Sequence, residues 1–213
     1  MSSDVLVTTP AQRQTEPHAE AVSRNRRQQA TFRKVLAVAM ATLREKSYAD
    51  LTVRLVAARA KVAPATAYTY FSSKNHLIAE VYLDLVRQVP CVTDVNVPMP
   101  IRVTSSLRHL ALVVADEPEI GAACTAALLD GGADPAVRAV RDRIGAEIHR
   151  RITSAIGPGA DPGTVFALEM AFFGALVQAG SGTFTYHEIA DRLGYVVGLI
   201  LAGANEPSTG GSE

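Results

Sequence analysis

The sequence predicts an all-α protein of about nine helices, and three observations support this prediction. Apolar residues recur at the three- and four-residue spacing of amphipathic helices through most of the chain. Proline, serine, threonine or aspartate stands where many of these patterns begin, as expected at helix N-termini. No segment alternates polar and apolar residues for long enough to form a sheet. The predicted helices span residues 26–46, 53–60, 64–71, 74–88, 101–115, 118–130, 135–156, 162–179 and 186–204.

The segment from Thr52 to Leu77 contains two short helices and the start of a third. Thr52 can cap the first helix, whose pattern breaks at Lys61. Pro64 begins the second at a first helical position, where its missing N–H costs nothing, and Ser73 can cap the third. Isolated helices shorter than about 12–15 residues are marginal in water, so the two short helices need neighbours. Their proportions fit a helix-turn-helix, whose second helix enters the DNA major groove.

The later helices have local start and stop signals of the same kind. The pairs Asp134-Pro135 and Asp161-Pro162 each combine a capping aspartate with a proline at the first helical position. Gly131-Gly132 and Gly157-Pro158-Gly159 end the helices before them, and Thr185 is placed to cap the last helix. These signals predict where the later helices begin and end.

The charge of the chain is distributed unevenly, although its net charge is zero. Between Arg24 and Ile78 there are eleven basic residues against two acidic ones, so this segment carries +9 and the remainder −9. A basic segment on an acidic body favours contact with a polyanion. The alternative from charge alone is a solvated basic face.

Catalytic and metal-binding motifs are not apparent in the sequence. Cys91 and Cys124 make no disulfide framework, and the five histidines have no metal-ligand spacing. No phosphate-binding glycine loop or nucleophile elbow occurs. We expect no cofactor and no enzymatic activity. No signal peptide is recognised, and the longest apolar run, Leu193–Ala204, is shorter than the roughly 20 residues that span a bilayer, so a cytoplasmic protein without a membrane partner is expected.

The last two predicted helices have more apolar surface than one packed face requires. The helix at 162–179 is apolar over a wide arc, and the helix at 186–204 is apolar almost all round from Leu193 onward. This pattern favours a homodimeric four-helix interface over a hairpin buried within a monomer. Glu169 falls inside the apolar arc, where a carboxylate needs a partner. It could pair with Arg192 or His187 of a second subunit, or it could contact a ligand. The predicted interface residues are Phe172, Leu176, Gly194, Val197 and Gly198.

The run from Arg26 to Leu77 resembles the DNA-binding domain of the TetR (tetracycline-repressor) family. The resemblance rests on Thr52-Val-Arg-Leu-Val-Ala-Ala-Arg-Ala-Lys-Val and on Thr66-Ala-Tyr-Thr-Tyr-Phe-Ser-Ser-Lys74, followed by Leu77. It covers about a quarter of the chain, and the helix count and apolar final pair agree with the family's body. The resemblance and the polar composition of the two ends together predict four parts: a disordered arm at 1–23, a helix-turn-helix domain at 24–76, a ligand-binding and dimerisation domain at 77–204 and a disordered tail at 205–213.

The resemblance also implies roles for individual residues. Thr52, Thr66, Tyr68 and Lys74 occupy positions that contact the phosphate backbone, and Arg26 is a further phosphate candidate. Tyr68 is expected to pack through its ring and direct only its hydroxyl outward. Groove contacts are expected from the exposed side of the second short helix. The candidates are Ala65, Thr69 and Tyr70.

Two residues depart from the family pattern. Lys61 stands where the family usually has glycine, at a turn that can require positive φ. Ala63 stands where a capping serine is common, and alanine has no capping oxygen. These departures put the pose of the recognition helix in question but remove no phosphate contact.

The function implied is a ligand-responsive repressor that binds a near-palindromic operator in double-stranded DNA as a homodimer and is released by a small, largely apolar effector. The alternatives are a helical sensor module without DNA function and an enzyme with an unrecognised pocket. For each pocket candidate, plain core packing remains the competing interpretation. The candidates are Leu107, Cys124, Leu128, Phe166, Glu169, Met170 and Phe173.

Overall fold

The chain folds as a helix-turn-helix end joined to a helical body. The computed structural model describes residues 17–204, with side chains from residue 25 onward, and no residue in that range lies in a strand. Most of the predicted arm and the predicted tail therefore lie outside the described residues. The helices are α1 (Pro17–Glu45), α2 (Val53–Arg59), α3 (Pro64–Tyr70), α4 (Lys74–Gln88), α5 (Met99–Ala111), η1 (Leu112–Val114), α6 (Pro118–Asp130), η2 (Gly131–Ala133), α7 (Pro135–Ile156), α8 (Pro162–Gly180) and α9 (Tyr186–Ala204).

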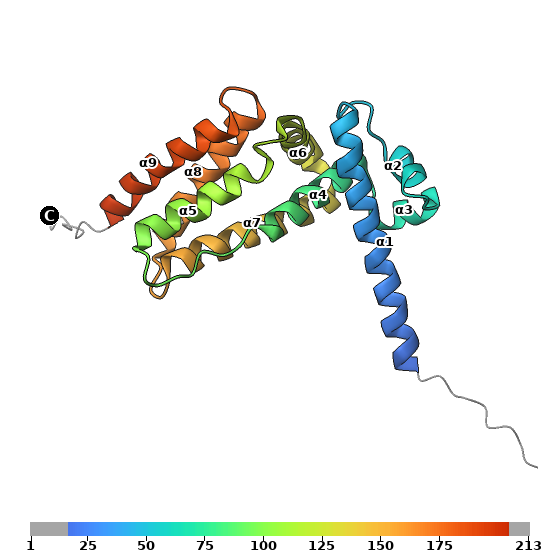
Figure 1. Cartoon of the computed structure of the whole chain (residues 1–213), viewed down its shortest axis with the longest axis horizontal. Coiled ribbons are helices and arrows are strands. Elements are labelled where there is room, and N and C mark those ends of the chain that lie inside the picture. Colours follow the sequence, from blue (N-terminus) through green and yellow to red (C-terminus); the bar gives the residue numbers. More distant parts are fainter. Residues whose placement is uncertain (1–16, 205–213) are drawn as a thin grey trace, which may run out of the picture.

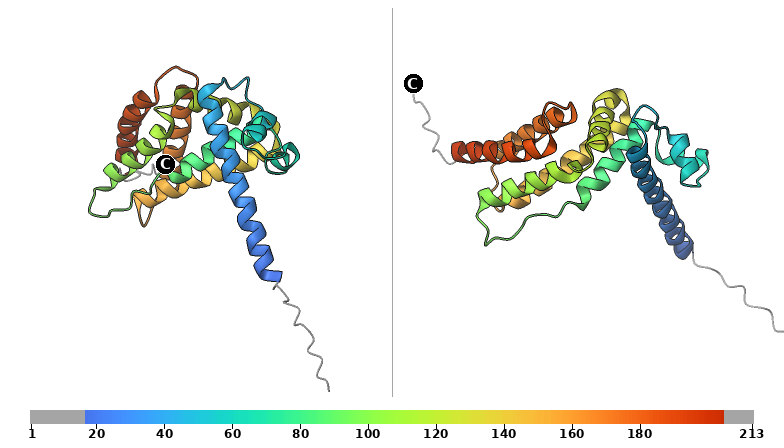
Figure 2. Two further views of the ribbon diagram at one scale, coloured as in Figure 1. Left: turned by 45° about the vertical axis from the view of Figure 1, so that its right-hand side comes forward. Right: turned by 45° about the horizontal axis from the view of Figure 1, so that its top comes forward.

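The helices fall into two groups that α4 connects (Figures 1 and 2). Helices α2 and α3 lie beside the C-terminal half of α1, whose N-terminal half extends away as a rod. Helices α4 and α7 run together from this end into the body, where α5, α8 and α9 lie. The predicted all-α fold is confirmed for the described residues.

Most predicted helix ends match the structure to within one residue, and two helices, α1 and α5, differ by more. Helix α1 begins at Pro17, nine residues before the predicted start and inside the predicted arm. The segment lacks an apolar stripe, but its alanines and glutamate have high helix propensity and Pro17 suits a first position. The helix predicted at 101–115 instead begins at Met99, becomes α5 and ends at Ala111, where the tighter turn η1 follows.

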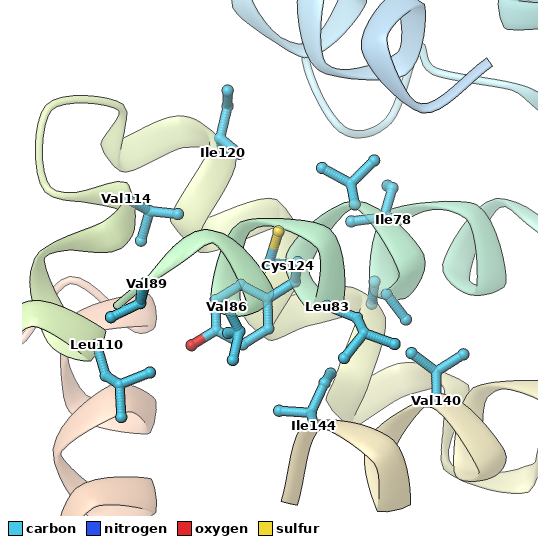
Figure 3. Packing of buried hydrophobic residues seen from close by; sticks show 14 of the residues in the cluster. Ile78, Leu83, Val86, Val89, Leu110, Val114, Ile120, Cys124, Val140 and Ile144 are labelled. Carbon is cyan, nitrogen blue, oxygen red and sulfur yellow. The ribbon is translucent and has the colours of Figure 1, made fainter. Parts of the chain in front are cut away.

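Helix α4 forms the centre of the core. Seven consecutive residues, 77–83, are buried, so this helix is covered on nearly every side. Figure 3 shows Ile78, Leu83 and Val86 of α4 close to Cys124 of α6 and Ile144 of α7. Because a helix covered all round cannot move without its neighbours, a change in packing around α4 affects both groups of helices.

A buried arginine fixes the C-terminal end of α4. Arg151 of α7 is 1% exposed and donates to the carbonyl oxygens of Val89, at 2.9 and 3.1 Å, and of Arg87, at 3.2 Å. These carbonyls have no intrahelical donor, so the guanidinium satisfies them. The Glu147 carboxylate accepts from Arg151 at 2.6 Å. Hydrogen bonds from Arg150 and Arg151 lower the pKa of Glu147 to about 2.

Candidate functional site

The helix-turn-helix is built from short-range caps and an unusual turn. The Thr52 side chain accepts from the Leu55 N–H at 3.1 Å, and Ser73 accepts from His76 at 3.0 Å. Between α2 and α3, Lys61 has φ 53°, the only positive φ of a non-glycine residue in the described range. The Lys61 and Val62 N–H groups bond back to the carbonyls of α2 at 3.1 and 2.9 Å, which closes a Schellman motif. The prediction that Lys61 occupies a glycine-type turn is confirmed.

Helix α3 has an exposed face that carries most of the predicted contacts. Ala63 makes no side-chain capping bond, as predicted, and Pro64 takes the first turn. Ala67 is the residue that α3 buries. The predicted contact residues on the exposed face are Ala65, Thr66, Tyr68 and Thr69. This exposure leaves them available to a partner, and their roles toward DNA remain predictions.

The two tyrosines of α3 differ in exposure from what the sequence predicts: Tyr68 is the more exposed and Tyr70 the more buried. Tyr68 is 51% exposed, so its ring does not pack as expected. Tyr70 is half-buried, with its ring 6.1 Å from that of Phe32 in an edge-on contact. Positions 68 and 70 lie at similar angles on either side of the buried direction that Ala67 and Phe71 define, so the Phe32 ring, not helical spacing, makes Tyr70 the more buried of the two. The groove role expected of Tyr70 stays a prediction, although its ring is half-buried against Phe32.

Lys74 begins α4 and is already held by a neighbour. Its ammonium donates to the Tyr48 carbonyl at 3.0 Å and lies 4.0 Å from the centre of the Tyr48 ring. The Tyr48 hydroxyl in turn donates to Asn75 at 2.6 Å. An ammonium has three donors, so this arrangement positions the charge and leaves donors for a phosphate. The other predicted phosphate contacts, Thr52 and Arg26, are exposed.

Polar contacts join the helix-turn-helix end to the body. Ser73 donates to Asp134 at 2.9 Å and lowers the pKa of that carboxyl. Arg44 of α1 donates two hydrogen bonds to Glu117, at the cap of α6, one of them 2.6 Å long. Both contacts cross from the first group of helices to the second, so they hold the helix-turn-helix end against the body.

Glu80 is a second point of connection, within α4 itself. The residue is 5% exposed and pairs with Arg143 of α7 and with His76, whose Nε2 lies 3.6 Å away. Burial raises the pKa of the Glu80 carboxyl, but hydrogen bonds from His76 and Arg143 outweigh that effect and leave it below its ordinary value. The buried carboxylate is therefore paired on both sides.

A largely apolar cavity of about 510 Å³ lies in the body between α4, α6, α7, α8 and α9. This volume is within the usual range for small-molecule sites. Three predicted pocket residues line it: Cys124, Leu128 and Phe173. Burial raises the pKa of the Cys124 thiol to about 12, so the thiol is neutral. The other lining residues are Tyr82, Gly121, Thr125, Leu129, Gly132, Arg141, Ile144, Leu176, Val177 and Tyr186.

Four predicted pocket residues do not line this cavity. Leu107 is fully buried in the core, whereas Phe166 and Met170 are 63% and 56% exposed on α8. Glu169 pairs within the same chain, with its Oε1 2.8 Å from the His149 Nδ1 of α7. Neither Arg192 nor His187 of the same chain is its partner, and the roles expected of Glu169 toward a second subunit or a ligand stay predictions. The apolar arc of α8 contains both an inner and an outer side, which a helical wheel cannot distinguish.

The predicted interface residues lie in different environments and do not form one exposed surface. Phe172 and Val197 are buried inside the single chain, at 0% and 1% exposure, so they cannot contact a second copy. Leu176 lines the cavity, and a Cβ on Gly194 would lie 3.3 Å from Thr104 of the same chain. Gly198 is exposed with open space around it.

The outer face of α8 and α9 carries the apolar surface that the sequence predicted. Its large exposed residues are Phe166, Met170, Val177, Tyr195 and Leu199. Five of the nine large exposed hydrophobics among the described residues lie here, beside a groove of about 760 Å³ between the two helices. By length and composition alone α8 could also cross a membrane, a test that core helices of soluble proteins pass as well. We call the five residues the α8–α9 face.

The described residues thus combine a basic helix-turn-helix with a helical body that contains an apolar cavity. No cluster of three or more potential metal ligands occurs among the described residues. Sequence reasoning missed Tyr82 and Tyr186 of the cavity, although Tyr82 stands within an otherwise strongly apolar stretch of α4.

Residues 35–81 match the family described as bacterial regulatory proteins, tetR family. A TetR transcriptional regulator from Rhodococcus sp. RHA1 is 20% identical with a TM-score of 0.69, and the match covers 85% of this chain and 99% of that one. A regulator from Mesorhizobium loti MAFF303099 is 19% identical with a TM-score of 0.56, over 83% and 98%. The SmeT–triclosan complex is 19% identical with a TM-score of 0.52, over 86% and 98%. The predicted TetR resemblance is confirmed, and the chain has the fold of TetR-family transcriptional regulators.

Proposed function

We propose that this protein is a ligand-responsive transcriptional repressor. As a homodimer it binds a near-palindromic operator through α3, and a small, largely apolar effector in the body cavity releases it. It acts in the cytoplasm and catalyses no reaction. The observation that carries the proposal is that α4 belongs to both sites, because Lys74 begins it and Tyr82 of the cavity follows eight residues later. At 1.5 Å per residue these positions are about 12 Å apart along the helix.

The contacts around α4 support a coupled response. A ligand that displaces α4 or α6 disturbs the Ser73–Asp134 and Arg44–Glu117 contacts that hold the DNA-binding end. An effector can change operator affinity only through such a difference between two states. The SmeT structure of similar fold is a complex with triclosan, a precedent that supports an apolar effector for this chain.

The α8–α9 face supports a homodimer. Two copies joined there bury apolar side chains that are otherwise in water, and the exposed glycines Gly174 and Gly198 have space for a close neighbour. A two-fold dimer presents two copies of α3, which matches a near-palindromic operator.

A gel-shift titration with DNA from immediately upstream of the protein's own gene tests the proposal. We expect specific binding that decreases steeply with salt, because the DNA-binding segment carries a net charge of +9. Binding no tighter than to unrelated DNA would favour the alternative, a ligand sensor without DNA function.

Lys74→Ala refines the phosphate assignment. We expect weaker binding to all sequences and a salt-dependence slope smaller by about 1. Arg108→Ala, which removes an arginine paired with Asp191 in the body, should leave the slope unchanged. An unchanged slope for Lys74→Ala would assign Lys74 to the Tyr48 contact alone.

A further inference from the structure

One cavity side chain has an unmet hydrogen-bonding need. Tyr82 lines the cavity and is 5% exposed, yet its hydroxyl has no hydrogen-bond partner among the described residues. Such a group costs free energy when it is buried alone, since it has lost water without a replacement. The other two unpartnered buried hydroxyls in this range, on Ser106 and Thr153, do not line the cavity.

The titratable neighbours of the unpartnered hydroxyl belong to the cavity lining. The groups close enough to raise its pKa, after burial itself, are the Cys124 thiol and the Tyr186 phenol, which both line the cavity. Tyr186 is engaged elsewhere, because its hydroxyl bonds to Thr125 and lies against Gly121, where a Cβ would come within 2.3 Å of it. Tyr82 therefore has a free donor in a site where its neighbours are neutral or already paired.

The charges around the cavity limit what can enter. No acidic residue is among the described residues that line it. The lining cation, Arg141, is exposed and donates to the Leu128 carbonyl. A cationic ligand would lose its hydration without gaining a carboxylate and would also meet Arg141, so the cavity disfavours cations.

Resting on the proposed function, we propose that the effector is an uncharged, mainly apolar molecule with one oxygen acceptor, such as a ketone or lactone carbonyl, that bonds to the Tyr82 hydroxyl. The apolar lining binds the body of the molecule, and the phenol selects the oxygen. Cationic amphiphiles of the same size are excluded.

Three probes of similar shape test this proposal: diphenylmethane, benzophenone and the benzhydrylammonium ion. Binding to the full-length protein is measured by calorimetry at neutral pH. We expect benzophenone to bind roughly 3- to 10-fold more tightly than diphenylmethane, the range expected for one net hydrogen bond, and the ammonium ion to bind weakest.

Two matched variants locate the effect. Tyr82→Phe removes only the hydroxyl and should abolish the preference for benzophenone while leaving diphenylmethane binding unchanged. Tyr195→Phe makes the same change on the exposed surface of α9 and should keep the preference. A preference that survives in Tyr82→Phe, tightest binding of the ammonium ion, or no binding of any probe would overturn the proposal. Operator binding by the ligand-free protein is measured in parallel. If the ligand-free protein does not bind the operator, that result counts against the proposed repressor function and not against the role of Tyr82 in ligand binding.

Discussion

The two ends of the molecule present opposite surfaces. Helices α2 and α3 bury a few small residues and expose hydroxyls and cations, whereas α8 and α9 bury one apolar side and expose another. A polar exposed face loses little free energy by remaining in water when no partner is bound. An apolar exposed face is unfavourable until it is covered. The first end therefore suits reversible contact with a polyanion, and the second suits a lasting contact between copies.

The largest expected effect is a substitution that destabilises the helix-turn-helix end and leaves the α8–α9 end intact. Phe71 is fully buried and its ring stacks on that of Phe32 with centres 5.0 Å apart. Phe71→Ala should destabilise the helix-turn-helix by about 3–5 kcal/mol and abolish operator binding, because it leaves a cavity in a small core. Hydrogen exchange and gel shift would report this, and light scattering should still show a dimer. Tyr68→Ala, a truncation on the exposed side, should weaken DNA binding without loss of stability.

Phe166→Glu should have the opposite result, because it should weaken the dimer and leave the helix-turn-helix end intact. A carboxylate at this position would be buried without a partner in a dimer joined at the α8–α9 face. The expected loss is about 2–4 kcal/mol of dimerisation free energy, with the helix-turn-helix still folded. Sedimentation or light scattering measures it. Val95→Glu alters an 82% exposed side chain outside that face and should leave the dimer intact. A dimer unaffected by Phe166→Glu would move the interface elsewhere.

A smaller expected effect is a pH-dependent stabilisation that the body has through Glu147 of α7. Glu147 has a pKa of about 2, below its ordinary 4.5, so its pairing stabilises the folded state above pH 4.5 and is lost as pH falls toward 2. Glu147→Gln should cost about 1–2 kcal/mol at pH 7, discounted for solvent access, and progressively less below pH 4.5. Urea unfolding at several pH values measures it, with the exposed Asp142→Asn as control. A cost that does not change with pH would assign the loss to packing.

The smallest effect concerns the strained turn between α2 and α3. Lys61→Gly relieves a positive φ and should stabilise the protein by about 0.5–1 kcal/mol, part of the gain being offset by the greater freedom of glycine when unfolded. Thermal unfolding measures it. Lys61→Ala keeps the Cβ and should give no gain, so equal stabilisation by both variants would mean that side-chain charge, not backbone strain, is responsible.

Helix ends were predictable where their signals act over a few residues. The side chains of Thr52, Asp134 and Asp161 each cap a helix by accepting a hydrogen bond from a backbone N–H two or three residues later. Each of these contacts depends only on residues within one turn of the chain. The strained turn at Lys61 was predicted from its place in the TetR-like pattern, and its backbone bonds also span only a few residues.

Side-chain directions in the body were not predictable in the same way. Phe172 and Phe166 have the same chemistry on one helix, but one is fully buried and the other is exposed. Which of them faces inward depends on how α8 packs against α6, α7 and α9, and the residues of α8 alone do not determine that packing. The Glu169 partner was missed for this reason, since His149 lies 20 residues away on another helix.

The hydrogen bonds from Arg151 hold the C-terminal end of α4 in place, so a rotation of the helix would use this end as its pivot. Tyr82 lies seven residues from Val89 and Ser73 sixteen, which correspond to lever arms of about 10 and 24 Å. A rotation of α4 about the pivot that moves Tyr82 by about 1 Å therefore carries the start of the helix by about 2 Å. In the ligand response that we propose, the ratio of these two displacements is set by where the pivot lies along the helix, so Arg151 would influence the sensitivity of a site that it does not touch.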